Sequence, residues 1–119
     1  MLDAWLPAFL LTCVLEVPIY ALLRRRLGPP RRHPVRRAAL LGLAVNAVTH
    51  PCVWFLFPRL GLPYWRGLAL AEVWVVVVEG VLLAAALRVP RGRLWVPAGA
   101  ALLANAVSLG VGLLARYLA

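Results

Sequence analysis

The sequence predicts an all-α integral membrane protein, a polytopic four-helix bundle that is built from two parallel αα-hairpin repeats. Three observations predict this fold class. The chain of 119 residues is 64% hydrophobic, with a mean hydropathy of +0.87, whereas soluble domains are only about half apolar. Its apolar residues gather in four runs, each long enough to cross a hydrocarbon core of ~30 Å as a helix. Its 13 basic residues are all arginines, and nearly all lie between those runs.

The four expected spans follow one another within a single domain, residues 1–119. They cover about residues 4–23, 38–57, 68–87 and 94–115. No basic residue precedes the first span, which distinguishes it from a secretory signal peptide. Segment 24–37 carries seven arginines together with Pro29, Pro30 and Pro34, so we expect a loop there. Segment 58–67 is rich in turn-forming residues and holds only two arginines.

The distribution of arginine predicts the orientation in the membrane. Ten arginines lie in the first and third loops, against two in the second loop and one near the C-terminus. Cytoplasmic loops collect basic residues, so we expect loops one and three in the cytoplasm and both termini outside a cell (inner) membrane. Because the arginines flank apolar runs, the net charge of +9 indicates orientation in a bilayer and not nucleic-acid binding. The expected outer aromatic belt consists of Trp54, Phe55, Phe57, Tyr64 and Trp65, and Trp95 marks the inner interface.

Polar groups recur in the same order in the two halves of the chain, 1–57 and 58–119. Glu16 lies one helix before the string Asn46-Ala47-Val48-Thr49, and Glu79 lies one helix before Asn105-Ala106-Val107-Ser108. Both halves would cross the membrane in the same direction, so the halves are predicted to be parallel repeats about an axis along the membrane normal. Chance similarity between segments rich in valine and alanine is the alternative.

The depth of the polar residues predicts that they meet. Glu16, Asn46, Glu79 and Asn105 lie about ten to twelve residues from the outer ends of their spans, near the middle of the membrane. Spacings of three, four or seven residues place further polar groups on the same helix faces. A carboxylate at mid-bilayer costs at least ~2.5–3.5 kcal/mol, which makes such a position a functional hypothesis. Hydrogen bonding that only holds helices together is the alternative, above all for the two asparagines and the hydroxyls.

We therefore expect a transport or ion site within the bundle. Its candidate residues are Glu16, Glu79, His50, Asn46, Asn105, Glu72, Thr49, Ser108 and Tyr20. Two carboxylates that share a dry site cannot both ionise cheaply, so the pair either carries a proton or ionises around a cation. His50, one turn from Asn46, is expected to face the acids as a relay on the outer side.

The predicted function is transport or conduction of protons, cations or small cationic solutes by a homo-oligomer in the lipid bilayer. Two alternatives remain at this stage. The chain could be an accessory subunit of a larger membrane complex, or an intramembrane enzyme with a metal on His50, Glu16 and Glu79. The second of these lacks another histidine within the membrane, so an enzyme is the less favoured reading. The sequence indicates no particular cofactor and no nucleic-acid partner.

A stripe of small residues on the fourth span, Ala100, Ala104, Ser108 and Gly112, predicts a surface for close helix packing. Small side chains allow helix backbones to approach one another within a membrane. The stripe is expected to pack either inside the bundle or against a second copy. Pro51, directly after His50, removes a backbone hydrogen bond and is expected to loosen the second helix there.

Overall fold

A computed structural model describes residues 2–27 and 34–119, and the described residues are almost entirely helical. The four long helices are α1 (Leu2–Leu27), α2 (Pro34–Pro51), α3 (Tyr64–Ala86) and α4 (Trp95–Leu118). A π-helix (Cys52–Leu56) and a 3-10 helix (Phe57–Leu60) extend α2, and a short 3-10 turn (Arg91–Arg93) precedes α4. By length and composition, four helical stretches can each cross a membrane. This confirms the prediction of an all-α fold with four helices of membrane length.

The helices extend beyond the apolar runs from which they were predicted. α1 continues through Arg24, Arg25 and Arg26 to Leu27, so these three arginines form its last turn and not a loop. Basic side chains suit this position, because they face the negative end of the helix dipole. α2 begins at Pro34, one of the prolines expected to break a helix. Proline is well tolerated in the first turn, where its missing N–H has no helical partner to lose.

The rest of the first loop, including Pro29, Pro30, Arg31 and Arg32, lies outside the described residues.

Pro51 changes the winding of the second span without ending it. The chain passes directly from α2 into the π-helix, in which the Phe57 N–H donates to the Cys52 carbonyl. A missing proline N–H removes one bond of the α-helical ladder, and the wider π turn follows directly after this position. The helical path ends at Gly61, whose φ of 65° lies in the left-handed region that glycine adopts without strain.

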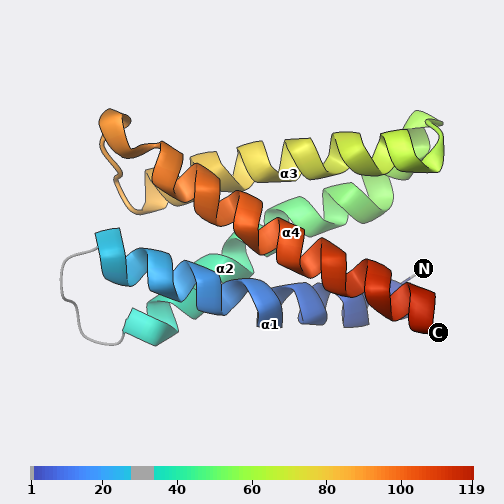
Figure 1. The fold of residues 1–119 in the computed structure, drawn as a ribbon, viewed down its shortest axis with the longest axis horizontal. Coiled ribbons are helices and arrows are strands. Elements are labelled where there is room, and N and C mark those ends of the chain that lie inside the picture. Colours follow the sequence, from blue (N-terminus) through green and yellow to red (C-terminus); the bar gives the residue numbers. More distant parts are fainter. Residues whose placement is uncertain (1, 28–33) are drawn as a thin grey trace.

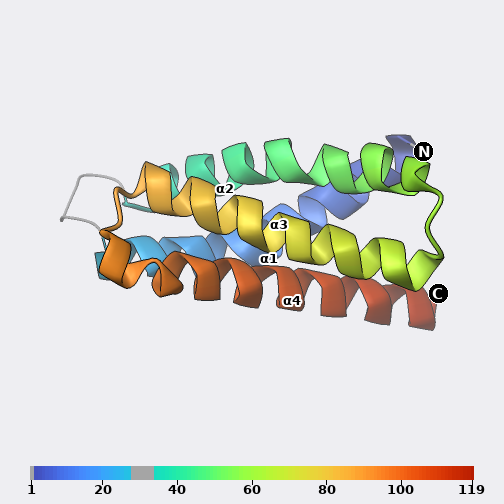
Figure 2. The ribbon, with the colours of Figure 1, turned by 90° about the horizontal axis from the view of Figure 1, so that it is seen from above.

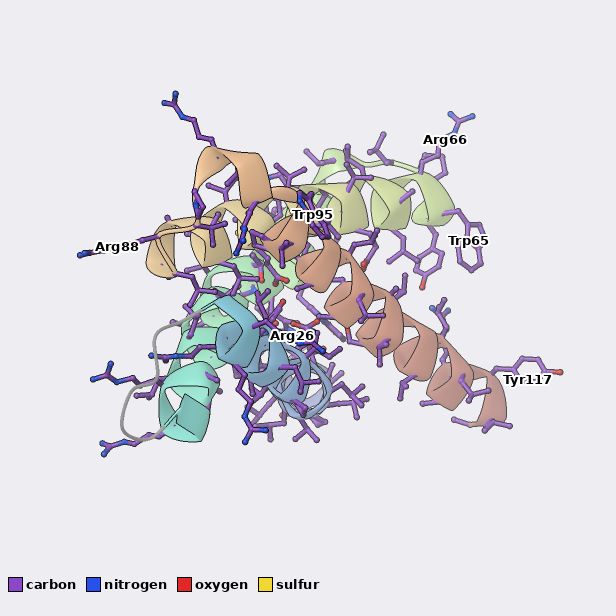
Figure 3. The ribbon with its side chains drawn as sticks, turned by 60° about the vertical axis from the view of Figure 1, so that its left-hand side comes forward. Arg26, Trp65, Arg66, Arg88, Trp95 and Tyr117 are labelled. Atoms are coloured by element: carbon purple, nitrogen blue, oxygen red, sulfur yellow. The ribbon has the colours of Figure 1, made fainter. Side chains whose placement is uncertain are left out.

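The four helices form a square in which neighbours along the chain are neighbours in space. α1 packs beside α2 and α4, and α3 packs beside α2 and α4 (Figures 1 and 2). The C-terminal end of α1, the start of α2 and the α3–α4 link lie at one end of the bundle, which we call the arginine end. Both termini and the α2–α3 connection lie at the other, which we call the terminal end. Figure 3 shows Arg88 extending outward at the arginine end, and Trp65, Arg66 and Tyr117 at the terminal end.

The two halves of the bundle differ in packing. The half toward the arginine end holds a buried apolar cluster of Tyr20, Leu23, Val45, Leu83, Ala101 and Ala104. Glycines let the helices approach there: a Cβ on Gly42 would lie 3.0 Å from a methyl group of Val17, and one on Gly80 would lie 3.4 Å from the Cα of Ala98. Toward the terminal end the helices diverge (Figures 1 and 2).

We expect Gly80→Leu to lower the free energy of unfolding by about 1–3 kcal/mol, the usual cost of overpacking a tight contact. The added side chain would meet the backbone of α4 at Ala98, which cannot rotate away. Gly110→Leu is the matched control, because nothing lies within 4 Å of a Cβ at that position. Thermal unfolding in detergent measures both variants. Equal shifts in the two midpoints would contradict the packing described here.

Candidate functional site

Two glutamates from diagonally opposite helices meet at the centre of the bundle. Glu16 on α1 and Glu79 on α3 are both fully buried, at 0% exposure. The Asn46 side-chain amide donates to Glu16 Oε2 at 2.9 Å, and the Asn105 amide donates to Glu79 Oε2 at 2.6 Å. The structure thus confirms that these four residues share one layer. Depth counted along each apolar run was sufficient to predict it.

Two hydroxyl groups complete the layer and connect the hairpins. Thr49 Oγ1 lies 2.7 Å from Glu79 Oε1, and Ser108 Oγ lies 2.9 Å from Glu16 Oε1. Each glutamate therefore receives an amide from its own hairpin and a hydroxyl from the other hairpin. The asparagine amides also bond in the same way to the carbonyl four residues earlier. The hydrogen bonds of one half reproduce those of the other.

Tyr20 is the exception to this paired pattern. Its hydroxyl lies 2.7 Å from Glu79 Oε2 and 3.3 Å from Glu16 Oε2, so the one group links both carboxyls. Leu83 follows Glu79 at the same spacing and carries no hydroxyl. Tyr20 lies four residues after Glu16, a spacing that places both on one helix face, but its bridging position depends on how close α1 and α3 come. Only the structure supplies that proximity.

The layer surrounds its carboxyl groups with neutral donors. Among the described residues, no arginine forms a hydrogen bond or an ion pair with Glu16 or Glu79, and every bond that they receive comes from an amide or a hydroxyl. A hydrogen bond to a charged group is worth about 1.5–3 kcal/mol, and a buried charge is tolerated only with such bonds. The site can hold negative charge without a cationic side chain.

Each hydroxyl of the layer also has a second acceptor. Thr49 Oγ1 lies 3.2 Å from the Val45 carbonyl oxygen, and Ser108 Oγ lies 3.2 Å from the carbonyl oxygen of Asn105. A hydroxyl has one hydrogen to donate and two lone pairs that accept. When the hydroxyl donates to the carbonyl, a lone pair is free to accept a hydrogen bond from a protonated carboxyl. Either glutamate can thus be ionised or protonated with the heavy atoms in the same places.

A cavity of about 810 Å³ reaches the layer from the terminal half of the bundle. Glu79, Thr49 and Ser108 lie at its inner end, and its lining extends to Tyr64 and Arg116 near the terminal end. Glu16 is not among the lining residues, but Asn46 and Ser108, which both bond to it, do line the cavity. The apolar cluster fills the bundle on the other side of the layer. The acids are therefore approached from one end only.

His50 does not join the carboxyl layer, contrary to its expected position as a relay that faces the acids. Its ring lies among those of Trp5, Phe9 and Trp54, with centroids 6.1, 5.5 and 6.1 Å away. Its Nδ1 is buried and has no hydrogen-bond partner among the described residues. His50 lies four residues after Asn46 and is therefore rotated from it by about 40° around a helix of 3.6 residues per turn. This rotation turns the His50 ring away from the carboxyl layer and toward α1, at the edge of the cavity.

Part of the expected outer aromatic belt is half-buried against other rings of the bundle. Trp54 stacks on His50, Phe55 packs against Trp5, and Phe57 packs against Trp74. Trp54 and Phe57 also line the cavity. The remaining belt residues, Tyr64, Trp65 and Trp95, are exposed as expected. Position along a span predicts depth, but the spread of the helices at the terminal end determines which rings turn inward.

The small-residue stripe of α4 packs within the bundle. Ala104 is fully buried, and Ala100 packs against the apolar cluster. Gly112, farther along the same stripe, lines the cavity instead, and a Cβ there would meet nothing within 4 Å. The first half of the stripe therefore packs against other helices of the chain, where α3 and α4 lie close. Its second half borders open space, where α3 and α4 separate.

The described residues contain no group of three or more His, Cys, Asp or Glu side chains placed to hold a metal ion. The metal set suggested by the sequence, His50 with Glu16 and Glu79, is not assembled, because His50 lies among aromatic rings. Cys13 and Cys52 are free thiols.

Fold and site together define a four-helix protein of membrane length with a buried, hydrogen-bonded pair of glutamates at the end of a cavity. Comparison with protein-family models, curated proteins and solved structures finds no match for the chain. Functional assignment therefore depends on the site itself.

Proposed function

We propose that the protein binds protons at the Glu16–Glu79 pair and uses them in the transport of protons, cations or small cationic solutes across a cell membrane. The observation that carries this proposal is the second acceptor of Thr49 and Ser108. It lets both glutamates gain or lose a proton without leaving an unpaired polar group. Structural hydrogen bonding alone does not require such an alternative. An amide in place of each carboxyl would hold the helices together at a lower desolvation cost.

The route of the proton follows from the cavity. In this proposal, water that fills the cavity reaches Glu79 itself and the hydroxyls of Thr49 and Ser108, which hydrogen-bond to Glu79 and Glu16 respectively. Tyr20 joins the two carboxyls, so a proton received by one is shared with the other through a single hydroxyl. Passage toward the arginine end requires the apolar cluster to separate. We therefore favour a carrier that opens to one side at a time over a continuous pore.

The paired hydrogen bonds support the proposal that residues 1–57 and 58–119 are repeats of one helical hairpin. Glutamate, asparagine and hydroxyl occupy equivalent places in both halves, and each hydroxyl reaches the glutamate of the other half. In this view, Tyr20 makes the two halves unequal. The repeat places a pair of acids on a pseudo-two-fold axis, where they must share their surroundings.

We propose that the arginine end faces the cytoplasm and that both termini lie outside. Of the described arginines, eight lie at the arginine end and three at the terminal end, in accord with the positive-inside rule. With Cys13 and Cys52 replaced, Gly92→Cys in the α3–α4 link should react with an impermeant thiol reagent only after the membrane is opened. Leu62→Cys, in the exposed α2–α3 connection, should react in intact cells. The opposite pattern would reverse the orientation.

The subunit and enzyme alternatives receive less support from the site. A subunit that binds a partner through its polar stripes would leave those stripes open, whereas here they bond to one another within the chain. An intramembrane metal enzyme needs a ligand set, and His50 is not placed to complete one. We keep the proposal of a homo-oligomer. Gly99 on α4 has open space around it, which permits close approach of a second copy.

The test of the proposed function is proton flux into liposomes that contain the purified protein and a trapped pH-sensitive dye. For the wild type we expect flux above that of empty liposomes. Thr49→Val and Ser108→Ala each remove one hydrogen bond to a carboxyl, and we expect each to slow the flux by about tenfold or more. Thr12→Val is the matched control, because Thr12 lines the same cavity but does not bond to the glutamates. Absence of wild-type flux at every pH would remove the transport proposal and favour the subunit alternative.

A further inference from the structure

Glu72 is a third carboxylate within the bundle, and its surroundings differ from those of the Glu16–Glu79 pair. It lies on α3 two helical turns from Glu79, roughly 10 Å along the axis at ~1.5 Å per residue. It is half-buried and lines the cavity. None of the hydrogen bonds between described residues involves it. A carboxylate that faces an open cavity without a partner in the chain is available to a ligand.

The cavity around Glu72 has the character of a ligand site. Its volume of about 810 Å³ falls in the range of small-molecule pockets, ~300–1,000 Å³. Its walls are largely aliphatic and aromatic, with Trp54, Phe57 and Tyr64 among them. The charged or titratable side chains that face this space are Glu72, Glu79, His50, Tyr64 and Arg116. Acidic groups occupy its interior, and the one arginine stands at the mouth.

The mouth of the cavity already accommodates a cation. The Arg116 guanidinium carbon lies 5.1 Å from the centre of the Tyr64 ring, and its Nη1 donates to the Tyr64 hydroxyl at 2.9 Å. A cation over an aromatic face is attracted by the negative charge of the ring, more strongly where water is excluded. Deeper in the cavity, the Trp54 and Phe57 rings lie among the lining residues together with the Glu72 carboxylate, and no cationic side chain is among the lining residues there.

We propose that the cavity binds an organic cation with an apolar body, its charge held by Glu72 and its body against Trp54 and Phe57. This inference rests on the proposed function and names its substrate class, and it assigns separate tasks to the three acids. Glu79 has both oxygens bonded to donors of the chain and, with Glu16, holds the proton. Glu72 has no such donors and takes the cation.

The spacing of the two acids couples the two ligands. A cation at Glu72 and a proton on Glu79 repel each other across roughly 10 Å, which at an effective dielectric constant of ~20 changes affinity on the order of tenfold. Binding of the cation favours release of the proton, and binding of the proton favours release of the cation. The two ligands therefore compete for the cavity, and the proton is still carried when no cation is present.

The test uses phenyltrimethylammonium and its neutral isostere tert-butylbenzene, measured by equilibrium dialysis against the protein in lipid nanodiscs, with empty nanodiscs subtracted. We expect saturable binding of the cation by the wild type, and a loss of affinity of at least tenfold in Glu72→Gln. Asp3→Asn is the matched control. It removes the same charge from an exposed position at the start of α1 and should bind as the wild type does.

Two results would overturn the proposal: equal binding of the neutral isostere, or unchanged cation affinity in Glu72→Gln. Proton flux measured on the same variants separates this inference from the proposed function. Asp3→Asn should retain flux, since its carboxyl lies outside both the pair and the cavity. Cation binding that depends on Glu72 in a protein without flux would leave the site standing and remove the transport proposal. Proton flux in a protein that does not bind the cation would remove the cation site and leave the transport proposal standing.

Discussion

Replacement of Glu79 by glutamine should reduce proton flux in liposomes to that of empty liposomes, while the thermal midpoint stays the same or rises. The hydrogen bonds of the layer explain both outcomes. Glutamine can place its amide group toward Thr49, which then donates to the Val45 carbonyl. Its oxygen can accept from Tyr20 and Asn105 as the carboxyl oxygen does. Glutamine thus reproduces the bonding of the protonated state but cannot lose a proton.

Stability should not suffer, because desolvation of a buried carboxylate costs several kcal/mol and an amide avoids that cost. Glu16→Gln should behave in the same way, with its amide toward Ser108 and its oxygen toward Asn46. Asp3→Asn, which removes a carboxylate from an exposed position outside the cavity, is the control in the flux assay and should keep wild-type flux. Flux that survives in both Glu16→Gln and Glu79→Gln would show that the pair does not carry the proton.

Replacement of Glu79 by leucine should be the most destabilising of the glutamate substitutions, with a loss of about 2–4 kcal/mol in the free energy of unfolding. Leucine accepts no hydrogen bond, so Asn105 loses the acceptor at 2.6 Å, and Tyr20 keeps only the longer contact to Glu16, at 3.3 Å. An unpaired buried donor costs about 1–3 kcal/mol. The expected loss in the free energy of unfolding is several times the ~0.6 kcal/mol that a single interhelical hydrogen bond contributes on average in a membrane.

The matched control is Glu72→Leu, which removes the same group from the same helix. Glu72 accepts no hydrogen bond from the described residues and faces the cavity, so this change should alter the free energy of unfolding by less than about 1 kcal/mol, within the scatter of ordinary substitutions. Thermal unfolding in detergent compares the two variants directly. Equal losses would mean that the layer at Glu79 contributes nothing beyond apolar packing.

The sequence predicted the layer because depth and helical period are properties of each helix taken alone. Apolar run lengths located the middle of each span, and spacings of three and four residues identified the faces of Asn46, Thr49, Asn105 and Ser108. The same rules failed for His50. On α2, the buried positions Gly42, Val45, Asn46 and Thr49 share one sector, and His50 lies at its edge, where the neighbouring α1 decides its surroundings.

Features that depend on the distance between helices could not be predicted in this way. The bridge made by Tyr20 requires α1 and α3 to approach across the diagonal of the bundle. The cavity requires the helices to diverge toward the terminal end, which turns Trp54 and Phe57 inward. The end of α1 was placed too early and the start of α2 too late, since arginines in the last turn and a proline in the first turn fit a helix without continuing its apolar run.

The central claim is that Glu16 and Glu79 exchange a proton with the cavity. Infrared absorption of the protonated carboxyl group tests it most directly, in a background of Asp3→Asn and Glu72→Gln, where the pair are the only remaining acidic side chains. Acidification should bring up a carboxyl band that shifts when the solvent is D₂O and that disappears when Glu16→Gln and Glu79→Gln are added. A spectrum unchanged by those two substitutions at every pH would contradict the account.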